Sequence, residues 1–286
     1  MNKQFSTADT NLYLNLLYLF KQNNSTEGHN VRAKWADGTP AHTIFMSDVT
    51  ERYDISKGEF PIITLRPIAV KSAIKEMLWI YQDQSNDLNL LRDKYNVTWW
   101  DEWDIGNRTI GQCYGATVKK YNLVDKLLNG LIEEPYGRRH IMSLWQEDDF
   151  SQRHGLKPCA FLTVWTVVGN KLNLYLLQRS SDVMMANSIN KIQYVALQMM
   201  VARHVGLEPG IFTHHVNNYH IYDRHILAAK EIMRRYNDKW YDGERKDPKL
   251  ELSDKKKNFY DFTIDDFTLI NYNPMEKLKN PLEIAI

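Results

Sequence analysis

Hydrophobic residues recur at helical spacing in two segments of the amino-terminal part of the chain. Among the first 22 residues, Leu12, Leu16 and Phe20 are apolar and are separated by polar residues. Residues 70–81 also carry apolar side chains three and four positions apart. Because one face of an α-helix repeats about every 3.6 residues, this pattern predicts two amphipathic helices. Polar residues interrupt the first segment too often for a signal peptide.

The middle of the chain has the pattern of β-structure. The segments AFLTVWTVV (160–168) and KLNLYLLQ (171–178) are rich in apolar and β-branched residues, and they flank Gly169 and Asn170. A Gly-Asn pair between two such segments is a turn signal. The sequence therefore predicts a β-hairpin here.

Two further helices are predicted on either side of a short strand at 210–216. One runs from about Asn190 to Gly206, and the other spans 220–236. Segment 259–272 alternates enough to be a strand or an edge segment. Helices and scattered strands follow one another without a linker or a repeat, which predicts the α/β or α+β class.

The composition agrees with one domain over residues 1–286. The chain has a mass of 33.7 kDa and 43% hydrophobic residues, enough for a substantial core. Its 36 basic and 35 acidic residues nearly cancel, so neither DNA nor a membrane is expected as a partner. Any bound anion must meet a local arginine cluster. No window approaches the roughly 18 apolar residues that span a bilayer, and we expect a cytoplasmic protein.

Two cysteines, Cys113 and Cys159, are too few for a disulfide framework or a cysteine-based zinc site. Cys159 follows Pro158 at the entrance of the predicted hairpin, where the end of a sheet can present its thiol. Such a cysteine is either a small buried core residue or a nucleophile. Arg179 ends the second predicted strand and favours the nucleophile, because a nearby cation stabilises the thiolate.

Arginines are the candidates for an anion site. Arg138 and Arg139 are adjacent in GRRHIMSLW, directly after a turn that contains Pro and Gly. They could present two guanidinium groups to a phosphate, or they could be solvated surface charges. Arg32 precedes the turn-forming ADGTP and could add a third group from a flexible loop.

Aromatic residues cluster in VTWWDEWD, at Trp99, Trp100 and Trp103. Packing explains most tryptophan clusters, but aromatic walls also stack against flat heterocycles. The histidines do not indicate a metal site. His215 and His220 are five residues apart, whereas two ligands on one helical face are four apart.

Several segments taken together resemble the thymidylate synthase family along nearly the whole chain. The matching strings are, in order, VRAKWADGTPAHT, FPIITLRP, IKEMLWIYQ, NVTWWDEW, TIGQCYG, GRRHIMSLW, LKPCAFLT, LQRSSD, HIYDRH and DFTIDDFTLINYNP. The first string looks most like the bacillus-type members. This resemblance implies a large mixed β-sheet packed by helices, with one sheet face forming a dimer interface.

The resemblance also implies a reaction, the reductive methylation of deoxyuridine monophosphate (dUMP) to thymidylate (dTMP). Methylenetetrahydrofolate would be the co-substrate that donates the one-carbon unit and the hydride. Cys159 would add to carbon-6 of the base, with Arg179 holding the thiolate. Glu76 would assist proton transfers and folate activation, and Tyr114 would assist removal of the carbon-5 proton.

The same resemblance assigns the nucleotide site to residues of two subunits of a homodimer. Asn190 would read the uracil edge, because its amide can both donate and accept. His220 and Tyr222 would hold the sugar hydroxyl. The phosphate would be held by Arg32, Arg179 and Ser180 of one subunit and by Arg138 and Arg139 of the partner.

The folate site is implied in the same way. Trp100, Trp103 and Asp182 would border the pterin. The carboxyl-terminal Ile286 would close over the site and exclude water.

Departures from the family pattern lie mainly on the folate side. The segment from Val183 to Ile189 replaces a loop that normally contains glycine and touches folate, and TLRP replaces a basic TTKR-type segment. Two other functions therefore stay open. One is a deoxyuridylate hydroxymethylase of the same fold, and the other is a non-catalytic paralogue that binds nucleotide or RNA. Deoxycytidylate hydroxymethylases typically carry an acid in place of Asn190, so a uracil base is expected.

Overall fold

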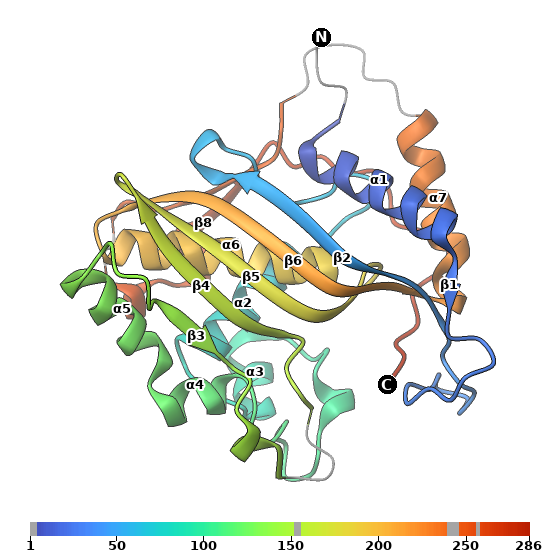
Figure 1. Cartoon of the computed structure of the whole chain (residues 1–286), viewed down its shortest axis with the longest axis horizontal. Coiled ribbons are helices and arrows are strands. Elements are labelled where there is room, and N and C mark those ends of the chain that lie inside the picture. Colours follow the sequence, from blue (N-terminus) through green and yellow to red (C-terminus); the bar gives the residue numbers. More distant parts are fainter. Residues whose placement is uncertain (1–4, 152–155, 239–245, 256–257) are drawn as a thin grey trace.

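A six-stranded β-sheet runs through the computed structural model, which describes residues 5–151, 156–238, 246–255 and 258–286 (Figure 1). The strand order is β1-β2-β6-β5-β4-β3. Strands β5 and β6 are parallel and the other neighbouring pairs are antiparallel, so the sheet is mixed. The strands are β1 (Asn24–Ser25), β2 (Thr43–Asp54), β3 (Ile141–Ser143), β4 (Ala160–Val168), β5 (Lys171–Asp182) and β6 (Glu208–Tyr222).

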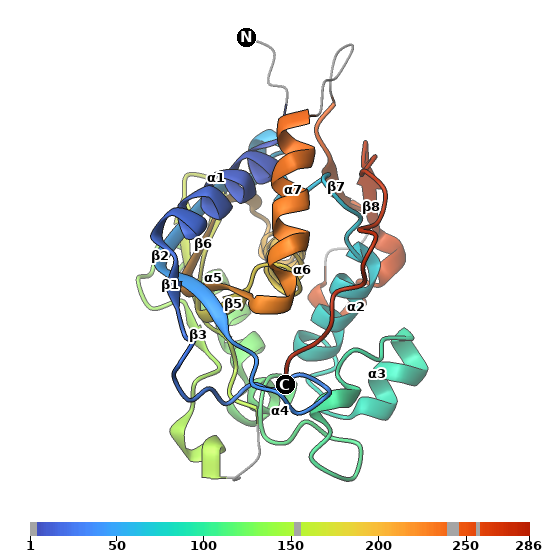
Figure 2. The same ribbon diagram turned by 90° about the vertical axis from the view of Figure 1, so that its right-hand side faces the viewer.

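Helices pack against one face of this sheet. Figure 2 shows α6 between the sheet and α2, whereas α1 and α7 pack together beside β2. In Figure 1 the sheet face toward the viewer carries no helix of the described residues. The α-helices of the described chain are α1 (Thr7–Gln22), α2 (Val70–Tyr81), α3 (Leu88–Tyr95), α4 (Gly115–Tyr121), α5 (Leu123–Glu133), α6 (Asn187–His204) and α7 (Ile226–Asp238).

The main hydrophobic core lies around α6. This helix is apolar on most sides, with Ile192, Leu197 and Met200 fully buried, because the sheet and α2 enclose it. On β5 the buried residues alternate with half-exposed ones, as a strand covered on one face requires. The core therefore fixes α2, α6 and β5 against one another.

Several predicted elements are confirmed. Helix α1 begins at Thr7, where the Ser6 side chain accepts a hydrogen bond from the Asp9 amide, and residues 1–4 lie outside the described chain. Helix α2 has the predicted bounds. Strands β4 and β5 form the hairpin, with Val168 opposite Lys171. Helix α6 is followed by Gly206 in the left-handed region, at φ 75°.

Other predicted bounds are wrong. His220 and Tyr222 belong to β6 and not to a helix, because pairing with β2 continues as far as Thr43 opposite Tyr222. Helix α7 starts only at Ile226. Strand β2 was not predicted, since the positive φ of 65° at Asp48 interrupts its alternation.

The carboxyl-terminal part is less regular than its alternation predicts. Of segment 259–272, only β8 (Phe267–Ile270) is a strand, and it pairs with β7 (Lys249–Leu252) in a separate two-stranded sheet. Short 3₁₀ turns occupy Phe259–Asp261 and Ile264–Asp266. Among the helices of the described residues, none combines the length and apolar character needed to cross a bilayer.

Candidate active site

Cys159 lies at the entrance of β4 and is held by Arg179 on β5. The Arg179 amide donates to the Cys159 carbonyl at 3.0 Å. The Arg179 guanidinium donates to the carbonyls of Pro158 (3.1 Å) and Lys157 (2.8 Å). The hairpin therefore brings the predicted thiol and cation together, and the same arginine orders the backbone before the cysteine.

Burial and nearby charge have opposite effects on the pKa of the Cys159 thiol. Burial raises the pKa of the Cys159 thiol, and the guanidinium groups of Arg179 and Arg32 lower it without cancelling the rise. The neutral thiol is thus favoured in this structure, contrary to the simple expectation that a nearby arginine yields a thiolate. Any further cation or proton acceptor brought to the site would shift this balance.

Tyr114 links the thiol to the aromatic cluster. Its hydroxyl accepts a hydrogen bond from the Cys159 amide at 3.1 Å, and its ring lies 5.4 Å from that of Trp100. The ring of Trp103 lies 5.5 Å from Trp100. Tyr114 has φ 46° and ψ −112°, an uncommon conformation for a non-glycine residue, directly before α4. Backbone strain of this kind is concentrated at functional sites.

Glu76 is a buried carboxyl on α2, with 5% of its surface exposed. Burial raises its pKa to about 7, against the opposing effect of Gln193, Trp100 and Trp99. The indole of Trp99 donates a hydrogen bond to it. At neutral pH this carboxyl is close to half-protonated, which suits a group that exchanges protons.

A small cavity joins Glu76 to the other predicted residues. Its volume is about 30 Å³, enough for a water molecule, and Trp100, Tyr114, Ala160 and Asn190 are among the residues that line it. The Cys159 backbone is linked to this cavity, because its amide donates to the hydroxyl of Tyr114, which lines the cavity together with Ala160, the residue after Cys159. The structure therefore gathers residues from α2, α6, β4 and the segment before α4 at one place.

The amide of Asn190 is held at both ends by glutamines that sequence reasoning missed. Gln178 donates to Asn190 Oδ1 at 3.1 Å, and Asn190 Nδ2 donates to Gln193 Oε1 at 3.0 Å. Gln193 is one helical turn from Asn190, and Gln178 directly precedes Arg179. These two positions in the sequence are the signals that could have indicated the glutamines.

The predicted sugar and phosphate residues lie on β5 and β6. Asp182 is opposite His220 in the parallel pair, and the Ser180 hydroxyl is 3.4 Å from His220 Nδ1. The Tyr222 ring is 5.2 Å from that of His220. Burial lowers the pKa of His220, which favours the neutral ring. Burial and the charge of Asp182 raise the pKa of Tyr222 to about 12.

Two other predicted residues, Arg32 and Ile286, lie on segments that contact each other. Arg32 lies in the loop before β2, close enough to Cys159 for its charge to act on the thiol. The backbone of Ile286 pairs with that of Lys34, two residues further along the same loop, through hydrogen bonds of 2.7 and 3.0 Å. The carboxyl terminus thus lies against the Arg32 loop.

Arg138 and Arg139 are not gathered with the other residues. Both are exposed between α5 and β3, and the Arg139 guanidinium is 3.4 Å from Glu134. No contact joins either of them to Cys159 within the described part of the chain. Strand β3 is an edge strand, so the pair lies near the edge of the sheet.

The segment from Val183 to Ile189 is held by its own turn and by Arg66. Asp182 Oδ1 accepts from the amides of Met184 (2.9 Å) and Met185 (3.3 Å), and the Arg66 guanidinium donates to the Met184 carbonyl. Arg66 belongs to TLRP, so the two departures from the family pattern contact each other. Sequence reasoning noted both departures but not their contact.

The histidines are engaged separately. His214 contacts Gln178, His215 contacts Thr50, and His225 contacts the Glu283 carbonyl. Among the residues that the structure describes, no group of three or more histidine, cysteine or acidic side chains is arranged to hold a metal ion.

The fold is that of a known class of enzyme. Thermostable thymidylate synthase A from Bacillus subtilis superimposes with a TM-score of 0.87 and 38% sequence identity, over 97% of this chain and 99% of that chain. The mixed sheet packed by helices is therefore a thymidylate synthase fold.

The sequence relationships lead to the same group. The family model described as thymidylate synthase matches residues 12–284. The thymidylate synthase of Lactococcus lactis subsp. cremoris is 47% identical over 93% of this chain and 98% of its own length. That of Streptococcus sanguinis is 46% identical over 97% and 99%, respectively. The chain belongs to the thymidylate synthase family.

Proposed function

We propose that the protein converts dUMP to dTMP, with methylenetetrahydrofolate as the donor of the one-carbon unit and the hydride. Family membership supports this reaction. The observation that carries it here is the arrangement of Cys159 beside Arg179, with the Cys159 amide bonded to Tyr114, which lines a cavity together with Asn190 and Glu76. A nucleophile, a base-reading amide and a proton-exchanging carboxyl are the groups that the reaction needs.

Cys159 provides the covalent step. Its sulfur bonds to carbon-6 of the uracil as the thiol proton leaves, and carbon-5 becomes the nucleophile that accepts the one-carbon unit. Arg179 and the phosphate-binding loop of Arg32 supply positive charge near the developing thiolate. Loss of the carbon-5 proton and cleavage of the bond between the one-carbon unit and the folate nitrogen leave an exocyclic methylene group. Hydride transfer from the folate, which becomes dihydrofolate, completes the methyl group as the bond to Cys159 breaks.

Asn190 reads the base, because Gln178 and Gln193 hold its amide in one orientation. A fixed amide presents a donor and an acceptor in a set order, as the uracil edge requires. His220 and Tyr222 bind the sugar hydroxyl from the end of β6.

Proton transfer falls to Glu76 and Tyr114. The pKa of Glu76, about 7, lets it accept and return a proton near neutral pH. The cavity beside it has room for a water molecule that can relay that proton. The Tyr114 hydroxyl assists removal of the carbon-5 proton, a role supported by its hydrogen bond from the Cys159 amide.

The folate binds on the far side of the base. Trp100 and Trp103 form an aromatic wall, Asp182 borders the pterin, and Ile286 covers the site to exclude water. Reduced folate must stay stacked beside the methylene group for hydride transfer.

The phosphate site includes two arginines of a second subunit. Arg32, Arg179 and Ser180 act within one chain, while Arg138 and Arg139 reach the site of the partner. Their exposure, and the lack of a contact between them and Cys159 in the described part of their own chain, support this division. The helix-free sheet face carries half-exposed apolar residues such as Val164 and Tyr175, which are paired across β4 and β5, and suits the interface of a homodimer.

A product assay with dUMP and methylenetetrahydrofolate tests the function. Equal amounts of dTMP and dihydrofolate are expected. Hydroxymethyl-dUMP with tetrahydrofolate would instead indicate the hydroxymethylase, and nucleotide binding without release of the carbon-5 proton would indicate the non-catalytic paralogue. Cys159→Ala should abolish turnover, whereas Cys113→Ala, which changes a buried thiol that donates to the Ile110 carbonyl, should be mild.

We also propose that residues 1–286 act as one catalytic domain in the cytoplasm. One hydrophobic core that includes residues from α1 to β8 supports the single domain. Limited proteolysis that released a stable, separately folded fragment would contradict it.

A further inference from the structure

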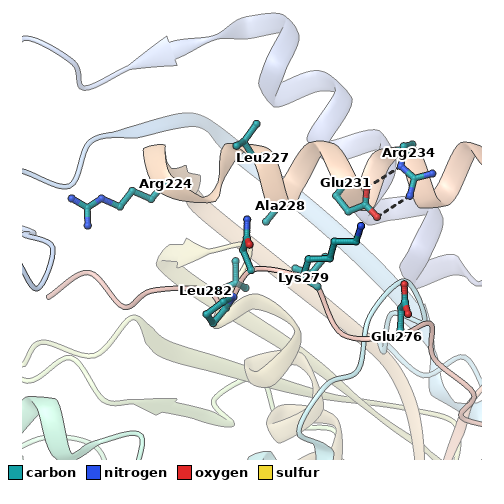
Figure 3. Close-up of a pocket in the computed structure, with 11 residues that line it drawn as sticks. Arg224, Leu227, Ala228, Glu231, Arg234, Glu276, Lys279 and Leu282 are labelled. Carbon is teal, nitrogen blue, oxygen red and sulfur yellow. Dashed lines mark hydrogen bonds and ion pairs between the residues drawn. The ribbon is translucent and has the colours of Figure 1, made fainter.

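A second, much larger cavity than the one beside Glu76 lies outside the site already discussed. It has a volume of about 580 Å³ and separates α7 from the carboxyl-terminal segment (Figure 3). Leu227, Ala228 and Glu231 of α7 line one side, and Lys279 and Leu282 line the other. None of the proposed catalytic residues lines it, so the cavity needs a different explanation.

The carboxyl-terminal segment is anchored on both sides of this cavity. Before it, the buried Arg235 guanidinium donates to the carbonyls of Leu65 (2.9 Å) and Glu276 (2.6 Å). After it, His225 Nε2 is 2.8 Å from the Glu283 carbonyl. Residues 278–282 therefore span the cavity between two fixed points, and we call residues 278–286 the strap.

Arg224 makes the second anchor a three-way junction. Its guanidinium is 3.0 and 2.8 Å from the two carboxylate oxygens of Glu283 in the strap. It is also 2.5 Å from an Asp37 carboxylate oxygen and 3.0 Å from the Thr39 hydroxyl in the loop that follows Arg32. The same group stacks 4.8 Å from the Trp35 ring.

This junction restricts the relative positions of its partners more than an ordinary surface ion pair does. A single exposed pair contributes little, but Arg224 contacts two carboxylates and a ring at once. Its planar guanidinium fixes their relative positions, as a point charge could not. The loop and the strap that it joins carry Arg32 and Ile286, the residues assigned to the phosphate and to closure.

We propose that Arg224 is a positioning residue that holds the carboxyl-terminal strap against the Arg32 loop and so couples phosphate binding to closure over the folate. This inference rests on the proposed function. Arg224 acts through Glu283 and Asp37 and touches neither substrate. The cavity beneath the strap leaves residues 278–282 room to move when the junction opens.

The test compares Arg224→Ala with Arg234→Ala. Arg234 is a matched control, because it also lines the cavity but, among the described residues, its ion-pair partners are Glu231 and Asp238 of α7 itself. We expect Arg224→Ala to raise the folate KM by about tenfold with a smaller fall in kcat, the change expected when a group that positions a lid is lost. The control should stay within about twofold of wild type, as surface substitutions do.

A second measurement does not depend on catalysis. Carboxypeptidase should release Ile286 from Arg224→Ala several times faster than from wild type or from the control, because the strap end is held less often. Glu283→Gln should show part of this increase, and Arg224→Lys should recover part of the loss. If Arg224→Ala does not fold, Glu283→Gln alone decides, and an unchanged release rate overturns the proposal.

The outcomes separate the two proposals. A wild-type protein that makes no dTMP contradicts the proposed function, while the carboxypeptidase rates still report on the junction. Equal KM values and equal release rates for the two arginine variants overturn the junction even if dTMP is formed. An equal fall in kcat for both variants would reflect general destabilisation and would also overturn it.

Discussion

Two buried glutamates on opposite sides of α6 show how the same type of residue can have a different pKa in two surroundings. Glu51 on β2 and Glu76 on α2 are 4% and 5% exposed, respectively. Glu51 is 2.6 Å from the buried Lys191 ammonium and accepts hydrogen bonds from Tyr53 (2.6 Å) and Asn15 (2.8 Å). Among the described residues, the side chains that act on Glu76 are all neutral: the amide of Gln193 and the indoles of Trp99 and Trp100.

The difference in partners reverses the effect on the pKa. Burial acts to raise the pKa of Glu51, but the charge of Lys191 and the hydrogen bonds around the carboxylate lower it below its ordinary value of 4.5. Burial dominates at Glu76 and raises its pKa to about 7. Glu51 is therefore a fixed charge that joins β2 to α6, whereas Glu76 can change its protonation state at neutral pH.

The largest expected effect is on activity. Glu76→Gln should lower kcat by about 10²- to 10⁴-fold, because it removes the group that exchanges protons with the substrates. The free energy of unfolding should change little at pH 5, where the carboxyl is already neutral. Steady-state kinetics and urea unfolding measure the two quantities. A kcat within tenfold of wild type would remove Glu76 from the chemistry.

Glu51→Gln should show the opposite profile. It leaves Lys191 buried without its counter-charge, so the free energy of unfolding at pH 7 should fall by about 3–5 kcal/mol. The folded fraction should keep most of its kcat. The double variant Glu51→Leu, Lys191→Met is the control, since replacing both partners by apolar residues should recover most of the loss. A loss below about 1 kcal/mol would contradict a structural role for the pair.

The two carboxyls should also give pH dependences of opposite sign. Between about pH 4.5 and 7 the folded protein keeps a proton on Glu76 that the unfolded chain has lost, so stability falls as pH rises. The rise of the pKa from 4.5 to about 7 corresponds to about 3 kcal/mol. Glu76→Gln should therefore gain stability relative to wild type across this window, as measured by urea unfolding.

At Glu51 the sign is reversed. Its lowered pKa stabilises the fold above the unfolded value of 4.5, and this contribution is lost as pH falls through the folded pKa. The deficit of Glu51→Gln should accordingly shrink below about pH 4.5. Parallel pH profiles for the two variants would show that the two sites do not differ in the way described.

The smallest effect is expected for Asn15→Ala. This change removes one of the hydrogen bonds to Glu51 while Lys191 and Tyr53 stay in place. Because Asn15 is only half-buried, water can replace part of the contact, and the free energy of unfolding should fall by about 1 kcal/mol. A loss as large as that of Glu51→Gln would mean that the asparagine, and not the cation, maintains the charged carboxylate.

Local pattern predicted much of the fold, because helices and hairpins depend on neighbouring residues. The bounds of α2 and the turn at Gly169 follow from periodicity and turn chemistry. The hairpin predicted that Arg179 lies near Cys159, but their direct pairing also needs the register shift between Ala160 and Leu162, because the unshifted register would place Ser180 opposite Cys159. The end of β6 could not be predicted from local pattern. Its last residues form a strand only because they pair with β2, which lies more than 160 residues earlier in the chain.

The sequence by itself determined the order of motifs and the near-zero net charge, and it indicated the thiol, the arginines and the amide that we propose for the site. Only the tertiary structure decided that Glu76 is protonatable at neutral pH while Glu51 is not, and that Arg224 joins Asp37 to Glu283. The physical reason is the same in both cases. The pKa of a buried carboxyl depends on which side chains are buried beside it, and the Arg224 junction depends on which side chains touch it. In both cases the neighbours come from distant parts of the chain and are set by packing between elements rather than by spacing along the sequence.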